Sequence, residues 1–196
     1  MEPLFALAMG LGLSAACGFR IFLPLTLMSL VANAGWINLP TELAWAGSGL
    51  ALGVLLSATL IEIAAYYIPW VDNALDAVAT PAAMLAGTLV TLGFAPEMSP
   101  VAQWSLALIA GGGLAGVTQG ATVATRATSS ATTGGLGNPI VATLEALFAT
   151  VVSLLALFAP LIGVVFVAGV LIWAFVKIFQ YMKRRPQKAN EAESVV

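Results

Sequence analysis

The chain has 196 residues, of which 60% are hydrophobic and 8% are charged, and its formal net charge is −2. A soluble domain carries about 25% charged residues, so this composition excludes a soluble globular protein and predicts an integral membrane protein. The sequence contains no histidine and one cysteine, Cys17, which excludes imidazole metal sites, an internal disulfide and a serine nucleophile activated by histidine.

Six apolar runs approach the length of about 20 residues that a transmembrane helix requires. Their approximate limits are residues 3–32, 43–68, 71–94, 101–126, 139–158 and 161–182. The runs are continuous, whereas the strands of a membrane barrel alternate between apolar and polar residues. The predicted fold class is therefore an all-α integral membrane protein with about six transmembrane helices, some of them broken or kinked.

The first run is too long for one straight span. Gly18 and Pro24 flank Arg20 inside it, and they predict a break or a kink at that point. Small residues recur at every fourth position upstream of Arg20, namely Ala8, Gly12 and Ala16. Small residues at this spacing let another helix approach closely. Since Arg20 is the next position in the series, we expect it to face a neighbouring helix rather than lipid.

The third run contains Asp72 and Asp76, which are four residues apart and therefore share one helical face. The run is interrupted by Thr80 and Pro81. The two carboxylates are candidate cation ligands, and the alternative for Asp72 is that it caps the third helix. The pair does not identify a particular metal, and no cofactor is predicted.

Arg20 and Arg126 are the only basic residues before Lys177. Each is followed by an Ala-Thr-Leu segment that carries a glutamate, Glu62 after the first arginine and Glu145 after the second. One interpretation is that each glutamate pairs with an arginine as a structural contact. The other is that the glutamates are carboxylates that couple transport to a proton or a cation.

This repeated arrangement predicts an internal duplication within one transmembrane domain over residues 1–182. Repeat one covers about 3–94 and repeat two about 101–182. Because each repeat holds three spans, the two halves would have opposite orientations, as in many secondary transporters. Residues 183–196 form a basic and then acidic tail that we expect to be disordered. Its basic residues favour the cytoplasmic side, and an even number of spans places both termini there.

Residues 126–139 form a polar and flexible stretch between two apolar runs. Asn138 is suited to cap a helix that has Pro139 at its first position, and the backbone N–H groups of such a terminus attract anions. With Arg126 nearby, the stretch predicts a binding site for an anion or a carboxylate, and the alternative is a flexible cytoplasmic loop. The candidate binding residues in it are Ser129, Ser130, Thr132, Thr133 and Asn138.

Three segments carry a resemblance to a known family: SAACGFRIFLP at 14–24, IPWVDNALDAV at 68–78 and ATRATSSATTGGLGNP at 124–139. They resemble the signature segments of a bacterial membrane-protein family, the domain of unknown function 4126, and the resemblance spans nearly the whole chain. It implies a bacterial inner-membrane location and no established activity. Members of the family often carry an acidic and a basic residue just before the Ile-Pro pair, where this chain has Tyr66 and Tyr67.

The hypothesis that these features favour is a small-solute or ion permease, a secondary transporter rather than an enzyme. Arg20, Glu62, Arg126, Glu145 and the hydroxyls of residues 129–133 would line its site. One alternative is a non-transporting scaffold or accessory subunit with structural arginine–glutamate pairs. Another is an enzyme that acts on lipid head groups. The expected partners are the lipid bilayer, a small ion or solute and further copies of the chain as a homo-oligomer, with no nucleic acid.

Overall fold

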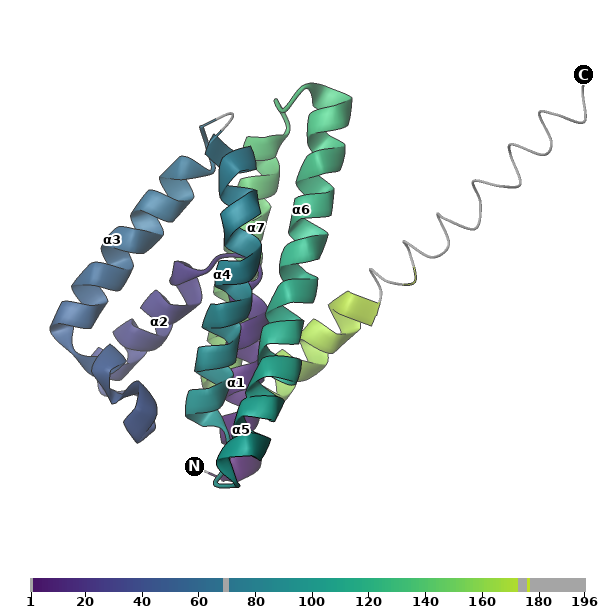
Figure 1. The fold of residues 1–196 in the computed structure, drawn as a ribbon. Coiled ribbons are helices and arrows are strands. Elements are labelled where there is room, and N and C mark those ends of the chain that lie inside the picture. The colour runs from purple at the N-terminus through teal and green to yellow at the C-terminus, as the bar shows by residue number, and fades with distance from the viewer. Residues whose placement is uncertain (1, 69–70, 173–175, 177–196) are drawn as a thin grey trace, which may run out of the picture.

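The computed structural model describes residues 2–68, 71–172 and 176, and these residues form helices joined by short connections (Figure 1). In chain order the elements are α1 (Pro3–Cys17), α2 (Phe22–Asn33), the 3₁₀-helix η1 (Thr41–Gly47), α3 (Gly49–Ala65), α4 (Val71–Phe94), α5 (Pro100–Leu106), the π-helical segment η2 (Ala107–Gly112), α6 (Gly113–Thr133) and α7 (Asn138–Phe158). A further apolar helix, Pro160–Ile172, follows α7. The described ranges contain no strand, which confirms the all-α fold class.

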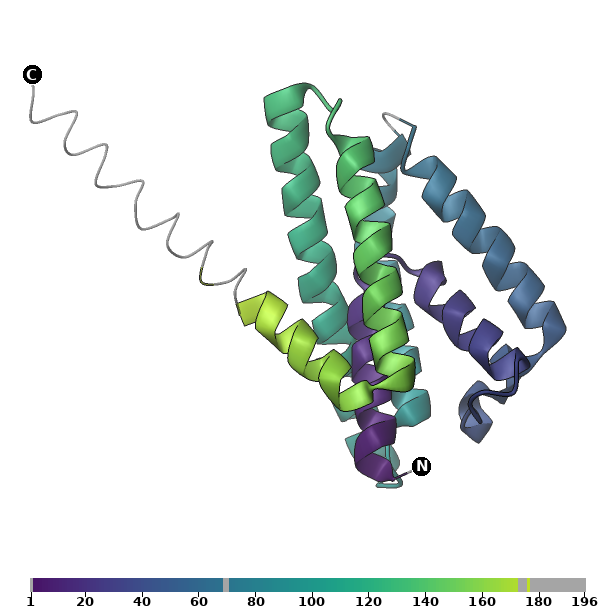
Figure 2. The same ribbon diagram turned by 180° about the vertical axis from the view of Figure 1, so that it is seen from behind.

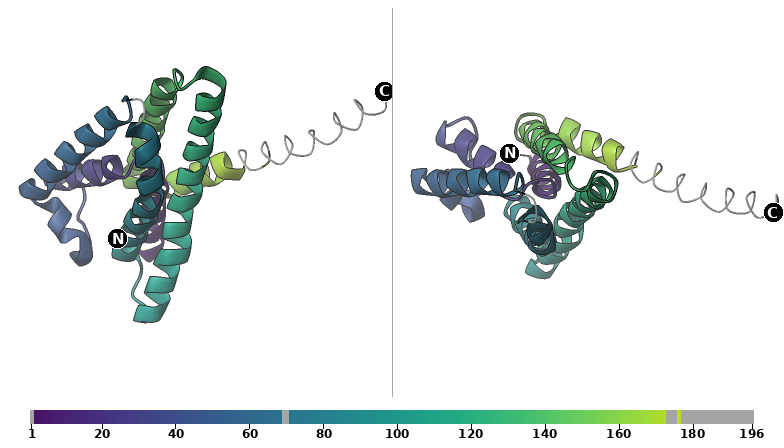
Figure 3. Two further views of the ribbon diagram at one scale, coloured as in Figure 1. Left: turned by 45° about the horizontal axis from the view of Figure 1, so that its top comes forward. Right: turned by 90° about the horizontal axis from the view of Figure 1, so that it is seen from above.

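Helix α1 lies in the middle of a bundle whose other members are α4, α6 and α7, as the view from above shows (Figure 3, right). A Cβ atom at Gly12 would lie 2.7 Å from the Cβ of Ala156 in α7, and one at Gly10 would lie 2.9 Å from the Cβ of Phe94 in α4. Only glycine allows approaches this close. The small residues of α1 therefore pack against two helices at once.

Helices α2 and α3 form a side arm that leans away from the bundle (Figure 1 and Figure 2). Because α1 ends at Cys17 and α2 begins at Phe22, the predicted break around Arg20 is confirmed. The two helices of the arm pack along each other, and the hydroxyls of Thr26 and Thr59 are 2.7 Å apart between them. The break turns the chain out of the bundle and leaves Arg20 at the junction.

Helix α4 is unbroken from Val71 to Phe94, with Pro81 in its interior. The interruption expected at Thr80 and Pro81 is therefore absent. Helices buried in a membrane tolerate an interior proline when their surroundings satisfy the freed backbone groups. The unbroken helix keeps both aspartates of its first two turns in one continuous element.

The elements α5, η2 and α6 form one continuous helix of 34 residues, Pro100–Thr133. The prediction of a flexible stretch over 126–139 is therefore wrong for its first half. The hydroxyls of Thr128 and Thr132 each donate to a backbone carbonyl one turn earlier, at 2.9 Å, so these side chains satisfy themselves on the helix. The helix ends where Gly134 and Gly135 take φ angles of 63° and 90°, which glycine permits.

Three helices within the described residues are long and apolar enough to cross a membrane: Ala74–Phe94, Pro100–Thr133 and Asn138–Phe158. The pair η1 and α3, bent by 74°, makes a fourth if it acts as one span. Helices α1 and α2 are shorter, because the break at Arg20 divides the first predicted run. The sixth predicted run extends into residues that the structure does not describe, and the predicted tail at 183–196 lies outside the described ranges altogether.

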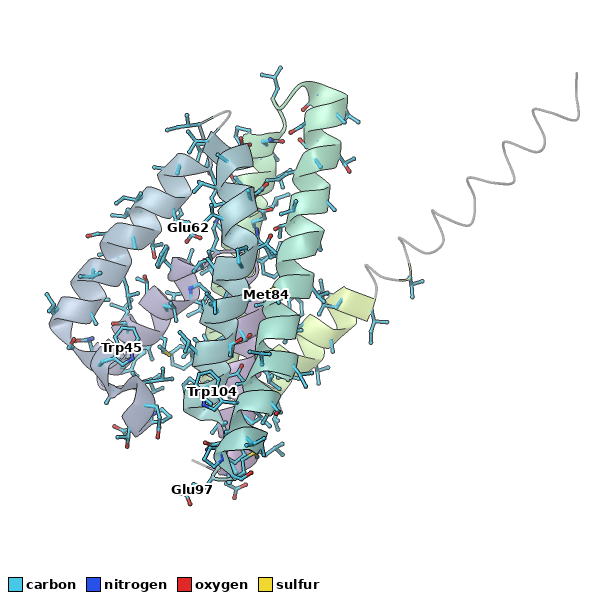
Figure 4. All side chains as sticks on the ribbon, in the orientation of Figure 1. Trp45, Glu62, Met84, Glu97 and Trp104 are labelled. Atoms are coloured by element: carbon cyan, nitrogen blue, oxygen red, sulfur yellow. The ribbon has the colours of Figure 1, made fainter. Side chains whose placement is uncertain are left out.

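The outer surface of the helices is largely apolar, as expected where helices contact lipid tails. Leu50, Val101 and Ile109 are among the most exposed side chains. Trp45 and Trp104 are also exposed, and both lie in the lower half of the molecule in Figure 4. Tryptophan at one level of a membrane protein fits anchoring at the interface with water. The composition and this surface together describe a membrane protein.

Candidate functional site

Five buried side chains and the partly buried Asp76, which together we call the charged centre, meet inside the molecule near the α6–α7 turn. They are Arg20 at the α1–α2 junction, Glu62 on α3, Tyr66 just after α3, Asp76 on α4, Arg126 on α6 and Glu145 on α7. The exposed fraction is 1% for Arg20, 2% for Arg126 and 5% for Glu145. Glu145 lies about 10 Å along α7 from its first residue, at 1.5 Å per residue. The centre is therefore about a third of the way along a helix of about 30 Å.

Arg126 connects three helices. Its Nε donates to Glu145 Oε1 at 3.1 Å, and its Nη2 donates to the other oxygen of the same carboxylate. Its Nη1 donates to Asp76 Oδ1 at 2.7 Å. Side-on arginine–carboxylate pairs of this kind are among the stronger polar contacts in proteins. The predicted pairing of Arg126 with Glu145 is confirmed, and Asp76 is an additional partner.

Arg20 contacts Glu145 rather than Glu62. Its Nη2 donates to the backbone carbonyl of Ala142 at 2.9 Å, and its Nη1 lies 3.3 Å from Glu145 Oε2. No hydrogen-bond partner among the described residues reaches Nε or Nη1. Arg20 is fully buried, as its place in the small-residue series predicts. Both arginines therefore share one glutamate.

Glu62 binds the start of α2. Its Oε1 accepts a hydrogen bond from the backbone N–H of Ile21 at 2.7 Å, and its Oε2 accepts one from Phe22 at 3.0 Å. Figure 4 shows Glu62 between α3 and the bundle. The pairing of Glu62 with Arg20 is thus replaced by a helix cap. The physical reason is the break after α1, which leaves backbone donors at the start of α2 without intrahelical partners.

Tyr66 is part of the centre, and sequence reasoning missed it. The centroid of its ring is 4.0 Å from the guanidinium carbon of Arg20 and 4.0 Å from that of Arg126. Aromatic faces attract cations, most strongly where water is excluded. The available signal was spacing, because Tyr66 follows Glu62 by four residues and continues its helical face.

A second polar cluster lies beside the α6–α7 turn. The amide nitrogen of Asn138 donates to Asp72 Oδ2 at 2.7 Å and to Ser130 Oγ at 3.0 Å. Asn138 is the first residue of α7 and Gly137 precedes it as the cap, so Asn138 does not fill the predicted capping role. Asp72 is 3% exposed. The cluster ties the start of α4 to both helices of the turn.

The remaining candidate residues of the serine and threonine stretch lie at its edge. Ser129 is partly buried near Gly137, whereas Thr132 and Thr133 are exposed. The Thr133 hydroxyl accepts the backbone N–H of Gly137 at 3.0 Å, so it supports the turn. The structure therefore brings Ser130 and Asn138 to the second cluster and leaves Thr132 and Thr133 outside both clusters.

The aspartates on α4 have separate partners, Asn138 for Asp72 and Arg126 for Asp76. Within the described residues, no three Asp, Glu, Cys or His side chains form a group that could hold a metal ion. A cation at this face of α4 would have to replace the guanidinium of Arg126. The two aspartates could therefore bind a cation only if that cation displaced Arg126 from Asp76.

A cavity of about 1080 Å³ opens near the other end of the bundle, between the first residues of α1, the end of α4 and the connection before η1. Its charged lining residues are Glu2, Glu42 and Glu97, and Trp104 is also part of the wall. Figure 4 shows Glu97 and Trp104 well below Glu62. The cavity and the charged centre therefore lie at different levels of the molecule.

The comparison with protein families gives one match, over residues 7–180, to a family described as Domain of unknown function (DUF4126). The matched range includes every residue of the charged centre and of the second cluster, and it agrees with the resemblance of the three signature segments. No curated protein and no solved structure matches the chain.

Proposed function

The chain belongs to the family described as Domain of unknown function (DUF4126), which specifies no activity, and we propose from the charged centre that it is a small-solute or ion permease. The proposal includes six spans arranged as two inverted repeats. It also includes a bacterial inner-membrane location with both termini on the cytoplasmic side, and a homo-oligomer.

The observation that carries the proposal is the burial of two arginines together with their carboxylate partners inside an apolar bundle. Ionisable groups inside a membrane are expensive, and they commonly mark the path of a solute or an ion. One ion pair would be enough to tie two helices together. Here the contacts join the α1–α2 junction, α4, α6 and α7, so a ligand that displaces one contact acts on all four.

The levels of the centre and of the cavity support the same proposal. The centre lies toward the α6–α7 turn, and the cavity of about 1080 Å³ opens near the opposite end. Between them α1 packs closely on α7 at Gly12 and on α4 at Gly10. A closed middle with an opening on one side is the arrangement that alternating access requires. We infer that movement of α1 against these helices would change the accessible side.

The test is flux through the full chain reconstituted in liposomes, with sodium, potassium, chloride and a set of small carboxylates as solutes. We expect at least one solute to move faster than in liposomes without protein. Arg126→Gln, which breaks the contacts to Glu145 and Asp76, should lower that flux at least tenfold. Thr125→Ala is the matched control, since Thr125 is exposed and its hydroxyl donates to the carbonyl of Ala121 on its own helix. Absence of flux for every solute with folded wild-type protein would contradict the proposal.

A scaffold or accessory subunit is the second candidate, and one observation favours it. All three side-chain nitrogens of Arg126 donate to carboxylates, which is what a permanent structural contact requires. If this is the whole role, Arg126→Ala should unfold the protein and the pair Arg126→Ala with Glu145→Ala should restore folding. The double change removes one positive and one negative charge, so the net charge of the centre is unchanged.

A lipid head-group enzyme has less support. It requires Asp72 and Asp76 to share a metal, yet each carboxylate contacts a different side chain on another helix. Dependence of any lipid-modifying activity on Asp76 and on an added divalent cation would be needed to revive this hypothesis.

A further inference from the structure

The two arginines of the charged centre differ in how fully their donors are used. Arg126 donates from all three of its nitrogens to carboxylates. Arg20 donates one hydrogen bond, to the carbonyl of Ala142, and its Nε and Nη1 have no hydrogen-bond partner although only 1% of the residue is exposed. Buried donors without acceptors are costly. Arg20 is therefore the cation in the centre that has capacity for another acceptor.

Glu145 is the carboxylate that forms an ion pair with Arg20. Its Oε2 accepts a hydrogen bond from Arg126 and lies 3.3 Å from Arg20 Nη1, where no hydrogen bond forms. Arg126 thus forms hydrogen bonds with the carboxylate, whereas Arg20 lies beside it without a hydrogen bond. An anion beside Arg20 would meet the negative charges of Glu145, of Glu62, which is bound to the neighbouring Ile21, and of Asp76, which is bound to Arg126. Like charges this close oppose binding unless one of them is neutralised.

We propose that Arg20 binds the transported solute through a monovalent oxyanion group, such as a carboxylate, and that this anion enters together with one proton that neutralises Glu145. The proposal rests on the permease function. The proton and the anion carry opposite charges, so the net charge of the centre is the same before and after they bind. The neutral Glu145 carboxyl no longer opposes the anion, which accepts hydrogen bonds from the unused donors of Arg20.

Arg126 and Asp76 keep their contact in this arrangement, and the ring of Tyr66 faces both arginines. Arg126 is then the residue that holds α4, α6 and α7 together, and Arg20 is the residue that binds. A cationic solute does not fit this assignment, because the positive charge of Arg20, whose donors are unused, repels a cation. The two arginines, which look equivalent in sequence, are therefore separable by experiment.

The test is binding to the full chain in lipid nanodiscs. Formate, lactate, nitrate and chloride are added as sodium salts, and choline chloride controls for the cation. Thermal stabilisation and proton uptake from weakly buffered solution are measured at a mildly acidic and at a mildly alkaline pH. We expect formate, lactate or nitrate to bind with uptake of about one proton, more tightly at the acidic pH. Formate and lactate against nitrate distinguish a carboxylate solute from an inorganic oxyanion. The proposal is overturned if the protein responds only to the sodium ion, if it responds only to chloride, or if none of the salts has an effect.

Three variants assign the roles. Arg20→Gln should weaken anion binding roughly tenfold to a hundredfold, the effect of losing a charged hydrogen-bond donor. Arg20→Lys, which keeps the charge and loses the planar fork, should give an intermediate affinity, and it decides the matter if Arg20→Gln does not fold. Glu145→Gln imitates the protonated carboxyl, so it should bind the same anion at both pH values without proton uptake. Unchanged anion affinity in folded Arg20→Gln or Arg20→Lys protein overturns the proposal.

The outcome is separable from that of the permease test. Anion binding with proton uptake but without flux in liposomes would retain Arg20 as a binding residue and reject transport. If a cation is transported and the Arg20→Gln variant still transports it, the permease function stands and the proposal of anion binding at Arg20 is rejected.

Discussion

Glu62 on α3 accepts a hydrogen bond from the backbone N–H of Ile21, at 2.7 Å, and thereby fixes the point where the chain leaves the bundle and enters the side arm. Its second oxygen accepts the N–H of Phe22, so one carboxylate serves two donors at the start of α2. A buried acid in this position gains from the positive end of the helix as well as from the hydrogen bonds. The side arm depends on this contact.

Glu62→Ala should therefore lower the free energy of unfolding by about 2–3 kcal/mol, since two backbone donors lose a charged acceptor. Glu62→Gln should have a smaller effect, because its single carbonyl oxygen still accepts one of the two hydrogen bonds. The measurement is thermal unfolding in detergent, followed by tryptophan fluorescence. Glu42→Ala, which changes an exposed glutamate in η1, is the control and should shift the midpoint little. Equal midpoints for Glu62→Ala and Glu42→Ala would contradict the capping role.

Gly12 and Gly53 provide a matched pair of glycine-to-alanine changes. A methyl group at Gly12 meets the Cβ of Ala156 at 2.7 Å, whereas one at Gly53 meets nothing within 4 Å. Gly12→Ala should destabilise the protein by about 1–3 kcal/mol through overpacking. Gly53→Ala should stabilise it by roughly 0.5–1 kcal/mol through helix propensity. The two changes should shift the unfolding midpoint in opposite directions, and a Gly12→Ala protein that is no less stable than wild type would show that α1 and α7 do not pack this closely.

Tyr66 should contribute through its ring. Tyr66→Phe keeps an aromatic face 4.0 Å from both guanidinium carbons, and it should be close to wild type in stability. Tyr66→Leu removes both cation–π contacts and should cost about 2 kcal/mol, the magnitude found for desolvated pairs. Tyr67→Leu is the control, since Tyr67 is exposed and its hydroxyl pairs with the Thr143 hydroxyl, at 2.7 Å, outside the charged centre. If Tyr66→Phe is as damaging as Tyr66→Leu, the hydroxyl rather than the ring carries the contribution.

Replacing Asn138 with aspartate should destabilise the protein more than replacing it with alanine. Asn138→Ala removes a donor from the buried carboxylate of Asp72 and should cost about 1–3 kcal/mol. Asn138→Asp is nearly isosteric but places a second carboxylate against Asp72, so it should destabilise further at neutral pH and recover as the pH falls. Thermal midpoints measured across the acidic range test this order. A pH-independent difference between the two variants would argue against direct contact with Asp72.

The sequence predicted the parts of the structure that depend on periodicity and on scarce charges. The break at Arg20 followed from its flanking glycine and proline, and the pairing of Arg126 with Glu145 followed from the rule that charges in an apolar environment find partners. Arg20 was expected to face a helix, and it does. These conclusions needed no knowledge of how the helices are arranged.

The remaining contacts could not be predicted because they depend on which helix ends lie beside which side chains. Glu62 binds the start of α2 because the break exposes backbone donors there, and nothing in the spacing of Arg20 and Glu62 indicates this. The helix to Thr133 was missed because serine and threonine resemble loop residues in sequence. Inside an apolar environment their hydroxyls bond to their own helix, as Thr128 and Thr132 do.

The π-helical segment η2 has a consequence for how such a sequence can vary. A π-helix holds more residues in each turn than the α-helix on either side of it, so its length sets the angle at which α6 begins. Because this turn is wound more loosely, deleting one residue from Ala107–Gly112 would let it close as an ordinary α-helical turn and would leave the orientation of α6 almost unchanged. Deleting one residue from α6 between Gly113 and Arg126 would instead rotate Arg126 by about 100° around the axis, away from Asp76 and Glu145. The π-helical turn is therefore the part of this long helix where the loss of one residue disturbs the charged centre least.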